Sequence, residues 1–195
     1  MFWRLVSPKV KNSLLLALFP LISTGCVTSR LVQDPLPMEA YRLAAVNERM
    51  LGLHVTAPRG PIGAGRQFIL LVIPFGRVML QAPEQQLTAA AFVELAKRGY
   101  RPLLGAAGGK SIDVQLTDVS AHAFDFLATR RIVCRVELHG ELRDRDNRLL
   151  RQWDAEGRST AWKQFAFAPQ MNYVFNQAMQ SAIEQLLQNL IADPI

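Results

Sequence analysis

The segment from Gly105 to Ser111 contains the residue types that hold phosphate in nucleotide-binding proteins. It reads GAAGGKS, and a phosphate-binding P-loop also ends in Lys followed by Ser or Thr. The P-loop spacing requires a glycine at position 104, where the chain has Leu104, and the motif must open a helix so that backbone N–H groups meet the phosphate. The residues that follow alternate between apolar and polar as in a strand, so we interpret the segment as a glycine-rich turn.

Three residues that could bind a metal, Asp118, His122 and Asp125, lie close together in the sequence. On a helix they would share one face, as a metal site requires. The neighbouring Val119 and Phe124 favour a strand or irregular structure instead, so we interpret His122 as a structural histidine hydrogen-bonded to a neighbouring carboxylate. No GxSxG, HExxH or CxxC motif is present, and no spacing places a nucleophile beside a base. The sequence predicts no catalytic residue, no metal site and no cofactor.

The start of the chain has the composition of a secretory signal. Three basic residues precede the apolar run: Arg4, Lys9 and Lys11. The run Leu14–Ile22 is too short to span a membrane and contains Pro20. The residues Ser23-Thr24-Gly25-Cys26 resemble the lipobox of bacterial lipoproteins, although the lipobox has Leu or a similar residue where Ser23 stands. Plain secretion after cleavage at the same bond, and an uncleaved anchor, are the alternatives.

The lipoprotein resemblance implies where the protein is held. In that family the cysteine carries a thioether-linked lipid and acyl chains such as palmitate, and it becomes the first residue of the mature chain. Cys26 would therefore be the lipidation site and the membrane anchor. Asp after the cysteine is the familiar inner-membrane retention signal, and Val27 stands there instead. The resemblance thus implies an outer-membrane lipoprotein that faces the periplasm, with the inner membrane or secretion as alternatives.

Composition and charge limit the class of protein and the kind of partner. Half of the 195 residues are hydrophobic, which is typical of a folded chain. Of the net charge of +6, three positive charges lie in residues 1–25, which contain no acidic residue. The remaining excess is too small to indicate a nucleic-acid partner. We divide the chain into a lipoprotein signal peptide (1–25), a tether with a short helix over 37–53 and a loop over 54–66 (26–66), and one α+β domain (67–195).

The hydrophobic pattern of residues 67–195 predicts the elements of this domain. We expect strands at 68–75, 100–104 and 112–119, a hairpin of 131–143 with 149–162, and helices at 85–98 and 169–191. The first strand, FILLVIPF, is predicted to be buried on both faces. The fold class is therefore α+β: a mostly antiparallel sheet with a long C-terminal helix and one or two further helices packed on one face. The apolar stripe of the last helix should lie on the apolar face of the hairpin.

Two groups of side chains remain after these elements are placed. Arginines between Arg130 and Arg151 alternate with acidic residues, which is typical of a solvated strand face and turn. Phe165, Phe167 and Met171 precede or open the last helix, and we assign them to the core, with an exposed apolar patch as the alternative. Cys134 lies on the apolar face of the hairpin, so we predict a buried, unpaired thiol; a disulfide with Cys26 is the alternative.

The order of these features resembles one group of envelope proteins. The lipobox, the strand that ends in Ile73-Pro74-Phe75, the hairpin and the last helix are similar to those of the YajG-type envelope lipoproteins, over about residues 66–192. The layout is more loosely similar to accessory lipoproteins of envelope transporters and to curli-secretion lipoproteins. The YajG-type group has no established enzymatic activity, so the resemblance implies no functional residues.

These observations together predict a non-catalytic, membrane-anchored envelope lipoprotein that binds a protein or a lipid or acts as a scaffold. One alternative is an accessory lipoprotein subunit of an envelope export or lipid-transport machine. A hydrolase with an unrecognised site is the other.

Overall fold

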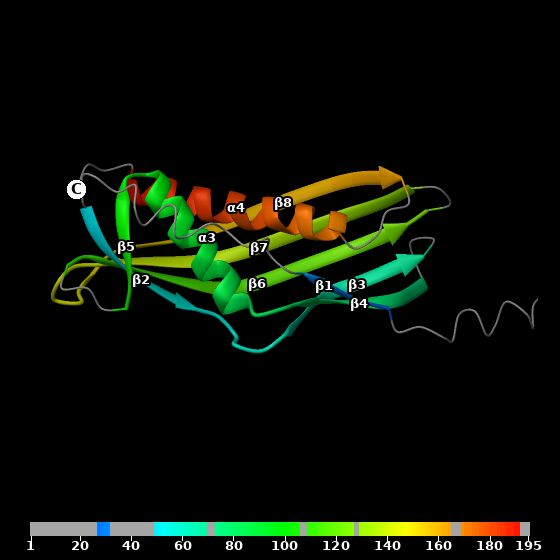
Figure 1. Cartoon of the computed structure of the whole chain (residues 1–195), viewed down its shortest axis with the longest axis horizontal. Helices are drawn as coiled ribbons and strands as arrows, with labels where there is room; N and C mark the ends of the chain where they lie inside the picture. The colour runs from blue at the N-terminus through cyan, green and yellow to red at the C-terminus, as the bar shows by residue number, and fades with distance from the viewer. Residues whose placement is uncertain are drawn as a thin grey trace, which may run out of the picture.

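The computed structural model describes residues 27–31, 49–69, 73–105, 109–126, 129–164 and 169–191. Within these residues the chain forms an α+β fold: a curved, mixed sheet with two helices on one face (Figure 1). The fold class predicted from the sequence is confirmed. No described helix has both the length and the apolar character needed to cross a bilayer.

Strand β6 (Ser111–Asp125) organises the sheet. Along one edge it pairs antiparallel with β7 (Thr129–Arg143), which in turn pairs with β8 (Leu149–Gln164). Along the other edge, its first five residues pair in parallel with β2 (Arg49–Thr56) and its last residues pair in parallel with β3 (Ile62–Ile69). The sheet therefore divides into two branches on this side of β6.

Each branch continues away from β6. Strand β2 pairs in parallel with β5 (Tyr100–Leu104), whereas β3 pairs antiparallel with β4 (Ile73–Leu80). Strand β4 then pairs in parallel with β1 (Val27–Leu31). The ends of β3, β6 and β8 and the beginnings of β4 and β7 meet at one end of the elongated sheet, on the right in Figure 1. We call this end the tip.

The two helices, α3 (Pro83–Lys97) and α4 (Pro169–Ile191), cover the same face of the sheet and touch each other. Helix α4 packs on β7 and β8, and its buried stripe includes Phe175, Ala182 and Leu186. The helix and the sheet approach closely because glycine lies between them: a Cβ on Gly157 would come within 1.9 Å of the carbonyl oxygen of Ala178. The prediction that the helix covers the apolar face of the hairpin is confirmed.

Several predicted elements agree with the structure. Helix α3, strand β5, the long hairpin and helix α4 lie where the periodicity placed them, although β6 runs further than 112–119. Gly99 follows α3 with φ +81°, as expected of the residue that ends a helix. In the hairpin turn, Asn147 adopts φ 62° while the Asp144 carboxylate accepts hydrogen bonds from the backbone N–H groups of Asp146 and Arg148.

The predicted buried strand over 68–75 is wrong. Phe68 and Ile69 end β3, and β4 begins at Ile73, which pairs antiparallel with Ile69. Ile69 and Ile73 are 40% and 42% exposed, so this apolar stretch reaches the surface at the tip. A continuous apolar run is typical of a strand buried on both faces, and the pattern alone does not show that the chain reverses direction within it.

The expected tether over 26–66 is also corrected wherever it is described. Residues 27–31 form β1, and most of the predicted 54–66 loop belongs to β2 and β3. The predicted helix over 37–53 is wrong at residues 49–53, which are part of β2; its remainder lies outside the described residues. The glycines and prolines of residues 54–66 favoured a loop. Pairing of β1 with β4, of β2 with β5 and β6, and of β3 with β4 instead places much of residues 27–66 in the sheet. The predicted signal peptide, residues 1–25, also lies outside the described part.

Candidate functional site

Three aromatic residues, an arginine and a proline form a row across the tip, on the face of the sheet opposite the helices. In the strand register, each of the five residues lies opposite the next on the neighbouring strand: Trp162, Arg131, Phe124, Phe68 and Pro74. Arg131 alternates with Ile132, which is buried on the helix side, so the row points the other way. We call these five residues the tip row.

Direct side-chain contacts join two pairs of residues within the tip row. The rings of Phe68 and Phe124 stack with their centroids 5.3 Å apart, and His122 lies 6.2 Å from each. The guanidinium carbon of Arg131 lies 5.6 Å from the Trp162 ring centroid, within the range of a cation–π contact. Trp162 nevertheless remains 58% exposed. The row therefore presents large apolar and aromatic surface beside a positive charge.

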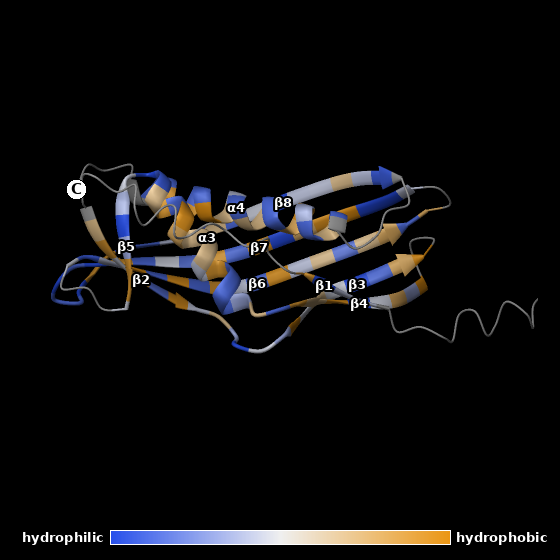
Figure 2. Cartoon of the chain, viewed as in Figure 1, coloured by the Kyte–Doolittle hydropathy of each residue, from blue (hydrophilic) through white to orange (hydrophobic). Residues whose placement is uncertain are grey.

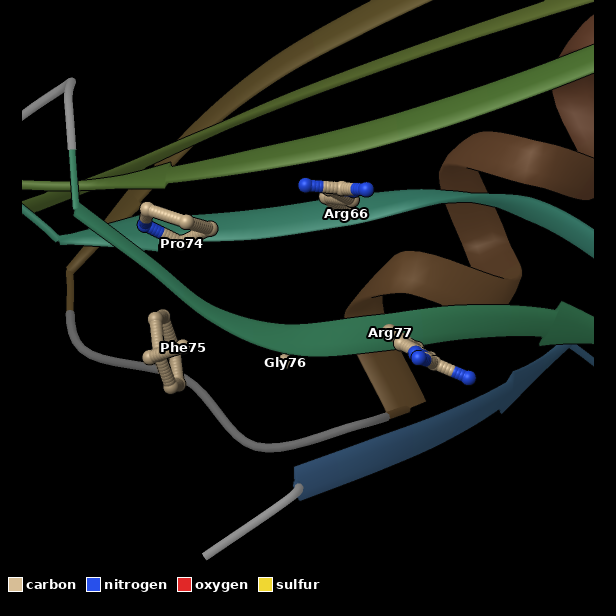
Figure 3. A pocket seen from close by; sticks show the side chains of 5 residues that line it. All are labelled: Arg66, Pro74, Phe75, Gly76 and Arg77. Carbon is tan, nitrogen blue, oxygen red and sulfur yellow. The ribbon is translucent and has the colours of Figure 1, made fainter. Parts of the chain in front are cut away.

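A pair of arginines lies behind the tip row. Arg66 on β3 and Arg77 on β4 are exposed and directly opposite each other in the register (Figure 3). With Pro74, Phe75 and Gly76 they line a shallow cavity of about 210 Å³. Like charges at directly opposite positions of two adjacent strands lower the stability of the sheet unless another group compensates them. Within the described part of the chain, neither guanidinium has an acidic partner.

The branch that carries this pair is uniformly basic. Strands β1, β3 and β4 contain Arg30, Arg66 and Arg77, and no Asp or Glu. Apolar residues lie at the tip end of β3 and β4, and others lie at the far end of β4 (Figure 2). On the helix side, buried Gln67 donates a hydrogen bond to the Ser29 hydroxyl (2.6 Å), which ties β3 to β1. This end of the sheet therefore combines exposed apolar side chains with uncompensated positive charge.

Several charged side chains elsewhere on the same face are paired with charges of opposite sign. Arg143 donates a hydrogen bond to Asp113 (3.0 Å), Arg135 bonds Glu156 (3.2 Å), and His139 Nδ1 lies 2.7 Å from an Asp154 carboxylate oxygen. Near the tip, on the helix side of the sheet, Arg130 donates a hydrogen bond to the buried Asp125 (2.8 Å). These contacts agree with a solvated face of compensated charges, as the alternating arginines and acids suggested.

The structure separates the residues that the sequence grouped as metal ligands. Asp118 is exposed on β6, whereas Asp125 is buried and paired with Arg130. No cluster of three His, Cys, Asp or Glu residues suited to a metal occurs in the described ranges. His122 Nδ1 accepts a hydrogen bond from the backbone N–H of Arg66 (3.4 Å), so its partner is the main chain and not the expected carboxylate.

The remaining candidates have different outcomes. The glycine-rich segment leads into β6 at Ser111, so a strand follows it, as the turn interpretation requires. Cys134 is buried and free, and burial raises the pKa of its thiol to about 12. Met171 is buried, which agrees with its assignment to the core. Cys26, Phe165 and Phe167 lie outside the described residues.

No family model matches the chain, and a search of curated proteins finds no match. Among solved structures, a Xanthomonas campestris protein of family DUF330 is similar over 85% of this chain and 95% of its own (12% identity, TM-score 0.47). A minor lipoprotein from Acinetobacter baumannii is similar over 74% and 93% (10%, 0.45). The rare lipoprotein B from Shewanella oneidensis is similar over 74% and 95% (10%, 0.46). No residue role is transferred from these structures.

Sequence reasoning missed the tip row and the Arg66–Arg77 pair. Both depend on which residues of neighbouring strands lie opposite each other, which the sequence alone does not give. The prediction of one continuous strand over 68–75 also excluded the change of chain direction that places β4 beside β3. One signal was available. The stretch from Arg66 to Arg77 has a basic residue at each end and no acidic residue between them.

Proposed function

We propose that this chain is a non-catalytic envelope lipoprotein, anchored in the outer membrane by lipid on Cys26, that faces the periplasm. In this role it is a binding or scaffold component for an envelope protein or lipid. The observation that carries the proposal is that the lipobox-like sequence ends at Cys26 and the folded domain begins at the next residue, Val27, in β1. A lipid on that cysteine would hold the sheet directly at a membrane.

The surface chemistry supports a binding role. The tip exposes aromatic, aliphatic and arginine side chains, which are residue types enriched where proteins contact partners. Away from the tip, several charged side chains of β6, β7 and β8 pair with one another. These pairs neutralise charge on the surface, whereas catalysis by a nucleophile requires a base poised beside it.

The two cysteines provide a matched test of the anchor. We expect Cys26→Ala to release the protein from the membrane fraction of the producing cells, because stable attachment needs the lipid chains. Cys134→Ala is the control, since it removes a buried thiol and leaves the proposed anchor intact. It should stay in the membrane fraction like the parent. The proposal fails if Cys26→Ala sediments with membranes as firmly as the parent after a high-salt wash.

A further inference from the structure

We propose that the tip lies against the bilayer surface, with Ile69, Ile73 and Trp162 in the headgroup region and the Arg66–Arg77 pair on the phosphates of anionic phospholipids. This inference rests on the proposed lipid anchor at Cys26 and adds which face of the domain the anchor presents to the membrane. The ligand is the phosphate-bearing surface of an anionic bilayer.

The position of β1 provides the first argument. Val27 lies opposite Gly76, and β4 begins three residues earlier, at Ile73. At about 3.3 Å per strand residue, the chain enters β1 roughly 10 Å from the outermost residues of the tip. Cys26 is bonded to Val27, so its Cα is about 3.8 Å from that of Val27. An acyl chain on Cys26 would hold this end of the sheet at the membrane, because no tether separates the cysteine from the fold.

Charge provides the second argument. Arg66 and Arg77 lie opposite each other in the strand register without an acidic partner in the described residues, and Arg30 lies on the neighbouring strand. Phosphate oxygens of anionic lipids would compensate this repulsion, and guanidinium groups bind phosphate well because they can donate two parallel hydrogen bonds. Basic residues next to a membrane anchor are drawn to anionic leaflets in the same way.

The exposed apolar side chains provide the third argument. Ile69 and Ile73 project at the extreme end of the β3–β4 pair, and Trp162 is the most exposed aromatic ring of the tip row. Tryptophan favours the boundary between headgroups and acyl chains, where its ring is buried and its N–H stays solvated. The contact between Arg131 and Trp162 places a cation at the level of the headgroups.

The two tryptophans of β8 allow a direct test. Trp162 is at the tip, whereas Trp153 is partly buried opposite Gly140, roughly 30 Å further along the strand at about 3.3 Å per residue. In a Trp3→Phe background, Trp153→Phe leaves only Trp162 as fluorophore, and Trp162→Phe leaves only Trp153. The full-length gene is expressed, and the protein is extracted in detergent and reconstituted into vesicles of phosphatidylcholine and phosphatidylglycerol with brominated acyl chains.

We expect brominated lipid to quench Trp162 emission at least twofold more than Trp153 emission. The double variant Arg66→Gln/Arg77→Gln should reduce the quenching of Trp162, whereas Arg145→Gln/Arg148→Gln, in the hairpin turn at the opposite end, should not. Equal quenching of the two tryptophans in protein that floats with the vesicles overturns the inference but leaves the anchor standing. Protein that does not float with the vesicles overturns the anchor and the inference together. Undiminished quenching in the Arg66/Arg77 double variant, or in vesicles of phosphatidylcholine alone, overturns the role of the arginines.

Discussion

His139 on β7 lies between two carboxylates on the exposed face of the hairpin. Its Nδ1 is 2.7 Å from Asp154, and its Nε2 is 3.6 Å from Glu141. The hydrogen bond to Asp154 raises the pKa of His139 most, and Glu141 adds to the effect. Because the folded-state pKa is raised, the stabilisation from this contact is complete below the unfolded-state pKa of about 6.5 and is lost as the pH rises through the folded-state value.

We therefore predict that Asp154→Asn lowers the pKa of His139, which can be measured by following its ring signals in an NMR pH titration. Asp146→Asn in the hairpin turn is the control and should leave the titration unchanged. An unaltered His139 pKa in the Asp154 variant would show that this contact is not formed in solution.

Cys134 is fully buried beneath α4, and its thiol pKa is about 12, compared with about 9 for a free thiol. A raised acid pKa means that ionisation favours the unfolded chain, so this thiol should lower the stability progressively as the pH rises above about 9. Cys134→Ala should show a shallower loss of stability between pH 9 and 11, measured by chemical denaturation. Identical pH slopes in parent and variant would contradict the burial.

Prediction from sequence succeeded for Cys134 because its neighbours alternate along one strand. It could not find the Arg66–Arg77 pair, because the pair exists only through the register of β3 on β4. It assigned His122 a carboxylate partner from sequence proximity, whereas the structure brings the backbone of Arg66 to the imidazole. The alternation of apolar and polar residues along a strand therefore predicted which side chains are buried. Contacts between residues on different strands could be identified only from the structure.

At the scale of elements, Leu186 is a central contact between helix α4 and the sheet. This side chain is fully buried, and its Cδ1 would be 2.8 Å from a Cβ on Gly140 of β7. Leu186→Ala should lower the free energy of unfolding by about 2–5 kcal/mol, because burial is lost and a cavity remains. Thermal or denaturant unfolding measures this change.

Leu150→Ala on β8 is the matched control for this substitution. It removes the same atoms from a side chain that is 50% exposed, so its cost should be much smaller. Equal costs for the two variants would contradict the packing of α4 on the sheet. Loss of membrane or partner association in Leu186→Ala without any loss of stability would show that the helix stripe is an interface.

The elements with clear periodicity were predictable, and those at the tip were not. Helix α4 and the β7–β8 hairpin each carry one uninterrupted pattern whose apolar face is buried by the other. The run FILLVIPF also has a strong pattern, but it belongs to two strands. An apolar pattern predicts burial, but an apolar side chain can also lie on an exposed surface. Ile69 and Ile73 at the tip are exposed in this way, so the pattern of this run gave the wrong structure.

At the scale of the whole molecule, the position at which the first strand begins determines how freely the domain could move relative to a lipid anchor on Cys26. A flexible tether over 27–36 would have let the domain turn freely above a membrane. Strand β1 instead joins the sheet at Val27, within the basic branch and near the tip. In our proposal, the anchor therefore fixes orientation as well as location.

The proposed lipid on Cys26 is the central claim, and intact-mass and peptide mass spectrometry of the membrane-extracted protein test it most directly. We predict a mature chain of residues 26–195 whose first residue, Cys26, carries a thioether-linked diacylglyceryl group. A chain that retains residues 1–25, or one that begins at Cys26 with an unmodified thiol, would contradict it.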